Sequence, residues 1–130
     1  MWRILAVVLF AANLLAQPSV VATWNDPNQG AFANCSATVT ANCLAGYNLY
    51  DTTNGRTKLN STVIPVPAGA MPTTLVTYTL GPYPNLGSRT IVATEAYVDG
   101  FGTAQESADS NTAAFIVKPA SPASLSITVK

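Results

Sequence analysis

Short β-prone runs separated by turn-forming clusters follow one another between residues 17 and 118. In the clearest run, residues 73–80 (TTLVTYTL), Leu75 falls on the face opposite Val76 and Tyr78, which suits a strand buried on one side. Nine prolines and eight glycines punctuate the chain, and no window in this range keeps helical spacing. We therefore expect an all-β domain, an antiparallel Greek-key β-sandwich of about seven strands.

Within this range, several segments have the composition or alternation of strands. The dipeptide Asn54-Gly55 predicts a tight turn between two of them. Residues 36–40 suit either a short strand or a tight loop, and residues 96–111 suit the end of a strand and a glycine-containing loop that leads into the next strand. The expected strands are residues 19–24, 47–50 (half-buried), one or two within 57–66, 73–80, 90–98 and 113–117.

The N-terminal residues have the pattern of a secretory signal peptide. Arg3 supplies a positive charge, and residues 4–16 are apolar except for Asn13. This run is shorter than the roughly 20 apolar residues that a membrane-spanning helix needs. We expect a signal peptide over residues 1–16, with cleavage after Ala16, and hence a secreted or cell-surface protein with no stable membrane span after cleavage. An uncleaved anchor or a buried first helix is the alternative.

The expected export of the chain decides how its two cysteines are interpreted. Cys35 and Cys43 are the cysteines of the chain, and an oxidising compartment favours a disulfide between them. A metal pair would need further Cys or His ligands, and the chain contains no histidine. Closing so short a loop is expected to stabilise the fold by about 2–3 kcal/mol.

Charge and composition argue against several classes of function. Only 9% of residues are charged and the formal net charge is zero, so we expect no nucleic-acid partner. Without histidine, the usual catalytic triads and most zinc and iron sites are excluded. Glu95 and Asp99 share a face if strand geometry persists between them, but they suit a solvated strand end and a turn better than a catalytic pair. We expect no enzyme, no cofactor and no metal.

One loop offers a calcium hypothesis that competes with this expectation. Asp99, Glu106 and Asp109 flank the loop near residue 100, and their carboxylates are oxygen ligands of the kind that Ca²⁺ prefers. The dense spacing of a calcium-binding loop is absent from this stretch.

Several short motifs occur in the order seen in fibronectin type III domains, which the chain resembles over residues 19–118. The matching segments are residues 20–24 with Pro27 for the second strand, 46–50 for the third, 78–80 with Pro82 for the fifth, and 96–111 for the last hairpin. The resemblance implies that Trp24, Tyr47 and Tyr78 lie in the core. It also implies a short or absent first strand, which leaves one sheet edge open. A related immunoglobulin-like sandwich is the alternative.

Five residues are candidates for contact with a partner. Phe101, between two glycines, is expected at a loop tip, where it either anchors a protein or glycan partner or folds back as a cap. Tyr83, between two prolines, is either a contact residue or filler of a corner. Beyond a Pro/Ser/Ala-rich linker at residues 119–124, Leu125, Ile127 and Val129 alternate with polar residues as in a strand. That strand either pairs within its own sheet, adds to an edge elsewhere, or frays.

These features predict a secreted, non-enzymatic β-sandwich that serves in extracellular adhesion or recognition. The alternative is a structural subunit of an extracellular filament or virus particle, assembled as a homo-polymer by edge-strand (donor-strand) pairing through the C-terminal strand. The open edge and the unpartnered terminal strand favour this alternative.

Overall fold

The computed structural model describes residues 19–82, 86–119 and 125–130, and within them the chain is all-β with no helix. The predicted signal peptide at residues 1–16 and the candidate contact Tyr83 lie outside the described residues. Eight strands form where about seven were expected, because two of them are only two residues long. The strands are β1 (Ser19–Asn25), β2 (Ala33–Asn34), β3 (Cys43–Asp51), β4 (Thr57–Lys58), β5 (Leu75–Pro82), β6 (Gly87–Val98), β7 (Ala104–Glu106) and β8 (Ala113–Val117).

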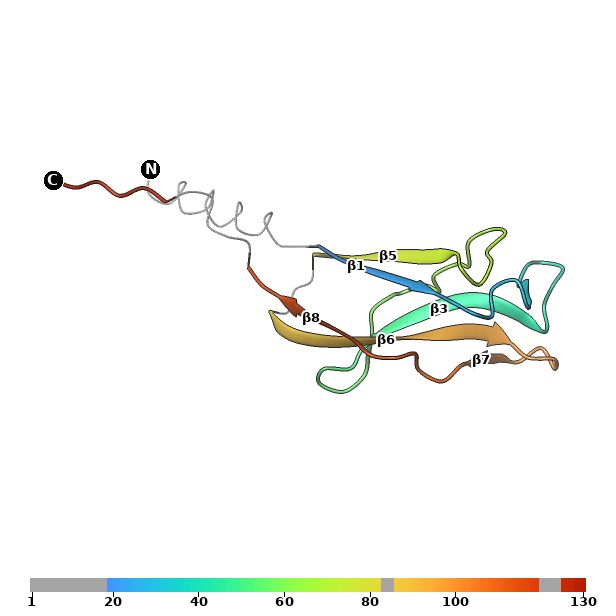
Figure 1. The fold of residues 1–130 in the computed structure, drawn as a ribbon. Helices are drawn as coiled ribbons and strands as arrows, with labels where there is room; N and C mark the ends of the chain where they lie inside the picture. The colour runs from blue at the N-terminus through green and yellow to red at the C-terminus, as the bar shows by residue number, and fades with distance from the viewer. Residues whose placement is uncertain (1–18, 83–85, 120–124) are drawn as a thin grey trace, which may run out of the picture.

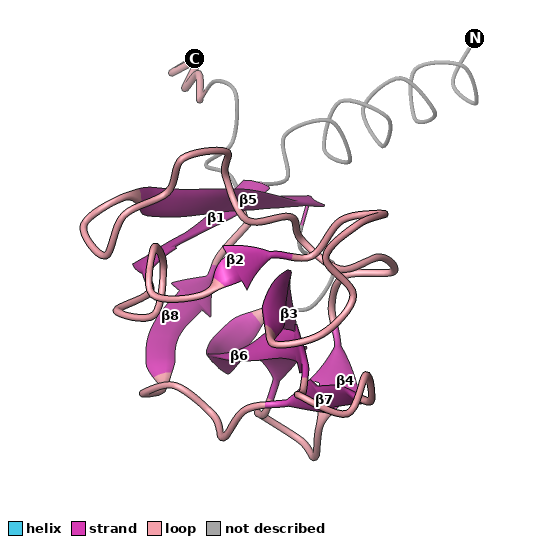
Figure 2. Ribbon diagram, turned by 90° about the vertical axis from the view of Figure 1, so that its right-hand side faces the viewer, coloured by secondary structure: helices cyan, strands magenta, loops and turns pink. Residues whose placement is uncertain are grey.

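The strands form two sheets that lie over one another in two layers (Figures 1 and 2). The smaller sheet is the antiparallel pair β1 and β5. In the larger sheet, β3 and β6 pair in the centre, β2 and β4 pair with β3, and β7 and β8 pair with β6. All of these pairings are antiparallel except that of β2 with β3. The arrangement is compatible with a β-sandwich.

The hydrophobic core lies between the two layers, as the alternation in the sequence predicted. Val76 is buried while Leu75 is 64% exposed, which confirms the expected faces of β5. Trp24 and Tyr78 are partly buried against the core, and Tyr47 is fully buried within it. The buried cluster consists of Ala22, Tyr47, Leu49, Ile64, Val76 and Ile91.

The central strand β3 differs from the half-buried strand that was expected, because it is buried on both faces. The outward side chain of Asn48 is only 3% exposed. Its Oδ1 accepts a hydrogen bond of 2.9 Å from Asn60, and its Nδ2 donates to Glu106 from the strand β7. Segments that follow β3 and β6 in the chain therefore cover the outer face of the larger sheet.

Three further segments differ from their predictions or settle an open alternative. Between residues 57 and 66, only β4 and an isolated bridge between Tyr47 and Ile64 form, since the prolines interrupt longer pairing. Residues 36–40 form a loop, in which the Ser36 backbone N–H donates to the Val39 carbonyl (3.0 Å). The chain after β6 contains one more strand than expected, because β7 and β8 pair with opposite ends of the long strand β6.

The bridge between Tyr47 and Ile64 depends on a glycine. Gly46 has a φ of +150°, and a Cβ at this position would lie 2.1 Å from the Ile64 carbonyl oxygen. The backbone around Ile64 therefore lies against β3, in an antiparallel bridge, at a point where only glycine fits.

Candidate functional site

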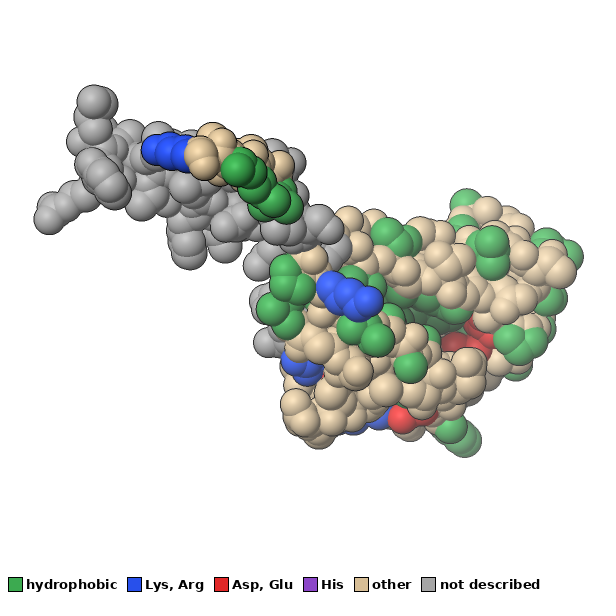
Figure 3. Space-filling view, turned by 60° about the vertical axis from the view of Figure 1, so that its left-hand side comes forward, with side chains coloured by type: hydrophobic (Ala, Val, Ile, Leu, Met, Phe, Trp, Pro, Cys, Tyr) green, Lys and Arg blue, Asp and Glu red, His purple; other side chains and the backbone are tan. Residues whose placement is uncertain are grey.

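A groove runs along one side of the molecule between β1 and β8. It has a volume of about 590 Å³. On its other side β1 pairs with β5, and among the described residues no strand pairs with the edge of β1 that borders the groove. Figure 2 shows β1 and β8 on the same side of the molecule, and Figure 3 shows a hollow between the layers with hydrophobic side chains inside it. The space between the two sheets is therefore open along this side.

The walls and floor of the groove are largely apolar. Ala22 and Trp24 contribute the inward face of β1, and Phe115 contributes that of β8. The core residues Leu49 and Ile91 lie at the floor. Side chains that would be covered in a closed sandwich thus line a surface depression.

Trp24 brings an unsatisfied polar group to this wall. Its ring stacks edge-on against Tyr47, with centroids 5.4 Å apart. Its indole Nε1 is buried and has no hydrogen-bond partner within the described part of the chain. Buried donors are normally paired, so this indole N–H is an unsatisfied donor next to the core.

A pair of carboxyl groups lies beside one end of the groove. A smaller cavity of about 200 Å³, lined by Asp26 and Glu95, shares Trp24 and Ala93 with the groove. Asp26 follows β1 and is 3% exposed, whereas Glu95 projects from β6, so the pair links the two layers.

Hydrogen bonds hold these two carboxyl groups in place. The Tyr47 hydroxyl donates to Asp26 Oδ2 at 3.0 Å. Asn28 donates to both acids, from its backbone N to Asp26 Oδ1 (2.8 Å) and from its side-chain Nδ2 to Glu95 Oε1 (2.8 Å). The Tyr47 hydroxyl also lies 2.7 Å from the side-chain amide of Gln29, which is fully buried.

The surroundings change the protonation of this cluster. Burial, followed by a hydrogen bond with Asp26, raises the pKa of Glu95 from 4.5 to about 7. Burial also raises the pKa of the Tyr47 hydroxyl, which therefore remains a hydrogen-bond donor at neutral pH. With this pKa, Glu95 is the member of the cluster whose charge is expected to change near neutral pH.

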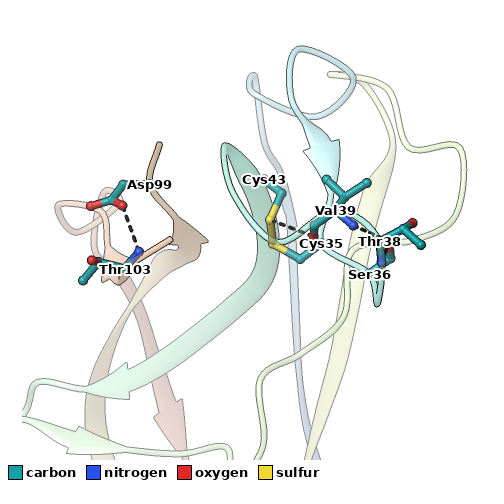
Figure 4. The surroundings of a disulfide bond; sticks show 7 residues. All are labelled: Cys35, Ser36, Thr38, Val39, Cys43, Asp99 and Thr103. Carbon is teal, nitrogen blue, oxygen red and sulfur yellow. Dashed lines mark hydrogen bonds between the residues drawn. A yellow bond between two sulfur atoms is a disulfide. The ribbon is translucent and has the colours of Figure 1, made fainter. Parts of the chain in front are cut away.

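The predicted disulfide is confirmed between Cys35 and Cys43, whose Cα atoms are 4.9 Å apart (Figure 4). It closes the loop that leads into β3. The backbone N–H of Asn42 in this loop donates to the Asp99 carbonyl in the turn after β6, at 3.1 Å. The side chain of Asp99 in turn accepts from the backbone N–H of Thr103 (2.9 Å). The two loops thus form one ordered end of the molecule.

The candidate contact residues on this loop and on the C-terminal segment are exposed. Phe101 is 95% exposed at the tip of the turn between β6 and β7, so the expectation that it could cap the sandwich is wrong. Leu125, Ile127 and Val129 are 86%, 81% and 89% exposed and belong to no strand. In this structure the C-terminal segment does not pair within its own sheets.

The structure does not assemble the predicted carboxylate groups. Glu95 pairs with Asp26 rather than with Asp99, whose side chain caps its own turn. The three acids named as calcium ligands do not come together, since the described residues contain no group of three possible metal ligands from His, Cys, Asp and Glu. Glu106 accepts from Tyr50 (2.6 Å), and Asp109 forms a two-pronged ion pair with Arg56 (2.8 Å).

Sequence reasoning missed the pairing of Asp26 with Glu95. Asp26 lies in a stretch with turn composition, Asn25-Asp26-Pro27-Asn28, and Glu95 is compared only with Asp99, an acid close to it in the sequence. The one available signal was an acidic residue, Glu95, inside an otherwise apolar and β-branched run. That signal marks an unusual position but does not identify the partner across the layers.

No protein-family model, curated protein or solved structure matches this chain. Among the residues that the structure describes, no helix is long and apolar enough to cross a membrane. Function is therefore inferred from the groove, the loop tip and the exposed C-terminal segment.

Proposed function

We propose that the chain is a secreted, non-enzymatic subunit of an extracellular assembly, joined to its neighbours by adding a β-strand to the free edge of β1. The observation that carries this proposal is the groove between β1 and β8, which opens the core along a sheet edge. The disulfide is consistent with an oxidising, extracellular location.

A fibronectin type III-like, Greek-key arrangement would explain why the edge of β1 is free. In that family the first strand lies beside the second, and β1 corresponds to the second strand. β5, β3, β6 and β8 then correspond to the fifth, third, sixth and last strands, a correspondence that their pairing supports. The free edge of β1 is the place that the missing first strand would occupy.

Strand addition suits both the polar and the apolar features of the groove. An unpaired strand edge presents backbone donors and acceptors that recruit another strand. Each apolar side chain that the added strand buries contributes about 1.5–3 kcal/mol.

Light scattering and negative-stain electron microscopy of the purified, oxidised chain test this function. We expect masses that grow with protein concentration and elongated particles in the micrographs. A discrete monomer at all concentrations, with the groove residues intact, would contradict an assembling role.

Phe101 supports a second candidate, the recognition of a protein or glycan by the loop tip. It is 95% exposed, and the Asp99 carboxylate holds its backbone N–H at 2.9 Å, so an aromatic ring is presented on an ordered turn. If recognition is the function, Phe101→Ala abolishes binding to cells or to a glycan array while leaving assembly and stability unchanged. Unchanged binding by this variant would reject the loop tip as the contact.

A further inference from the structure

We infer that the strand that fills the groove is residues 125–129 of a second copy of the chain, running antiparallel to β1, so that copies join head to tail. This inference rests on the proposed function and adds the partner, its segment and its direction. Three observations carry it: the pattern of the segment, the direction in which β8 ends, and the composition of the linker.

The segment has the pattern and length that the groove requires. Leu125, Ile127 and Val129 alternate with Ser126 and Thr128, so a strand here has one apolar face. All three apolar side chains are more than 80% exposed. Their contact with water is unfavourable, and covering them with a partner would remove it. Five residues in a strand span about 16 Å, within the roughly 23 Å of a seven-residue strand such as β1.

The direction of β8 favours a neighbouring copy over the same chain. β8 runs opposite to β6, with Val117 beside Gly87, while β1 and β6 point the same way in Figure 1. The chain therefore leaves β8 at the end of the molecule where β1 begins. A tail that filled the groove of its own chain would have to reverse direction immediately after β8. A tail that continues outward instead reaches a neighbour's groove at the end where the neighbour's β1 ends.

The linker composition opposes such a reversal. Residues 118–124 contain Pro119 and Pro122 within a Ser/Ala-rich stretch. Proline-rich linkers favour an extended conformation of about 3.1 Å per residue, so these residues would span roughly 20 Å. In the structure, residues 125–130 extend away from the sandwich (Figure 1).

The inferred contact joins two different surfaces, the groove of one copy and the tail of the next. Such a contact closes into a ring only if the rotation between copies allows it, and otherwise it produces an open filament. A filament then keeps one free groove at one end and one free tail at the other. A chain without its tail is therefore expected to cap growth.

Complementary variants test the inference directly. The acceptor lacks residues 119–130 and keeps the groove. The donor keeps the tail and carries Ala113→Arg, an exposed position on the inward side of β8 at the groove. Each variant is first checked for a native circular dichroism spectrum and melting transition. We expect each alone to be a monomer by sedimentation, and the mixture to form a one-to-one complex while the unmodified chain polymerises.

A labelled peptide of residues 118–130 keeps the test decisive if Ala113→Arg fails to fold. The peptide is expected to bind the acceptor, Ile127→Lys in the peptide to weaken binding at least tenfold, and Thr128→Lys on the opposite face to change it less than threefold. Peptide binding combined with a monomeric full chain would overturn the inference in favour of the chain's own tail. Polymers formed equally well by the acceptor alone would overturn the inference but leave an assembling function. Monomers together with no peptide binding would reject both.

Discussion

Replacement of Glu95 by glutamine is expected to remove a pH dependence of stability. In the folded chain, burial and the hydrogen bond with Asp26 raise the pKa of Glu95 from 4.5 to about 7. The folded state therefore binds a proton more tightly than the unfolded state does. The contribution of Glu95 to stability is therefore full below about pH 4.5, is lost as the pH rises from there to about 7, and does not change further above that value.

The size of the effect follows from the pKa change. One pKa unit corresponds to about 1.36 kcal/mol, so the full shift would amount to roughly 3 kcal/mol. Because Glu95 is partly exposed, solvent screening reduces this, and we expect about 1–2 kcal/mol. Glutamine retains an acceptor for Asn28 and a donor for Asp26, so Glu95→Gln should be more stable than the unmodified chain by this amount at about pH 8 and equally stable at about pH 3.5, below the unfolded-state pKa.

Urea unfolding with the disulfide intact measures this difference across the pH range. All of these proteins also carry Ile127→Lys, which is expected to prevent assembly, so that assembly does not contribute to the measured free energy of unfolding. Glu106→Gln is the control, because the pKa of Glu106 is lowered, mainly by the hydrogen bond from Tyr50. This control should lose stability at neutral pH, and the loss should shrink as the pH falls below its pKa. If the free energy of unfolding of Glu95→Gln changes with pH in parallel with that of the unmodified chain, the proposed coupling of Glu95 to folding is refuted.

Three further variants test the fold by denaturant unfolding. Trp24→Ala should cost about 3 kcal/mol, since it removes a partly buried ring stacked on Tyr47; a cost below about 1 kcal/mol would contradict that packing. Gly46→Ala should destabilise more than an alanine at an ordinary strand position, because its Cβ would lie 2.1 Å from a backbone carbonyl oxygen; a near-neutral effect would refute the close approach. Cys35→Ser with Cys43→Ser should cost about 2–3 kcal/mol, and unchanged stability would show that the disulfide does not constrain the unfolded chain.

Local patterns in the sequence predicted the strands well where one face is apolar and the other polar. β8 forms at the expected residues 113–117, and β5 has Val76 inside and Leu75 outside, as alternation indicated. The disulfide followed from the pair of cysteines, the absence of histidine and the expected export of the chain. These features depend on neighbouring residues, so the sequence carries their signal directly.

Features that depend on distant segments were not predictable in the same way. β3 is buried on both faces because Asn60 and Glu106 reach its outer side, and no local pattern in the sequence predicts these contacts. The Asp26–Glu95 pair joins residues from different layers, and the groove depends on where β1 lies relative to β8. A resemblance suggested an open edge, but only the arrangement of both sheets shows that the edge opens onto the core.

Hydrogen–deuterium exchange of the assembled chain tests strand addition at β1 most directly. The free edge of β1 and the tail should become protected together, because each would hydrogen-bond the other. We predict slow exchange at residues 19–25 and 125–129 in the full chain, and fast exchange at the free-edge amides of residues 19–25 once residues 119–130 are removed. Equal exchange of β1 in the two proteins would contradict the account.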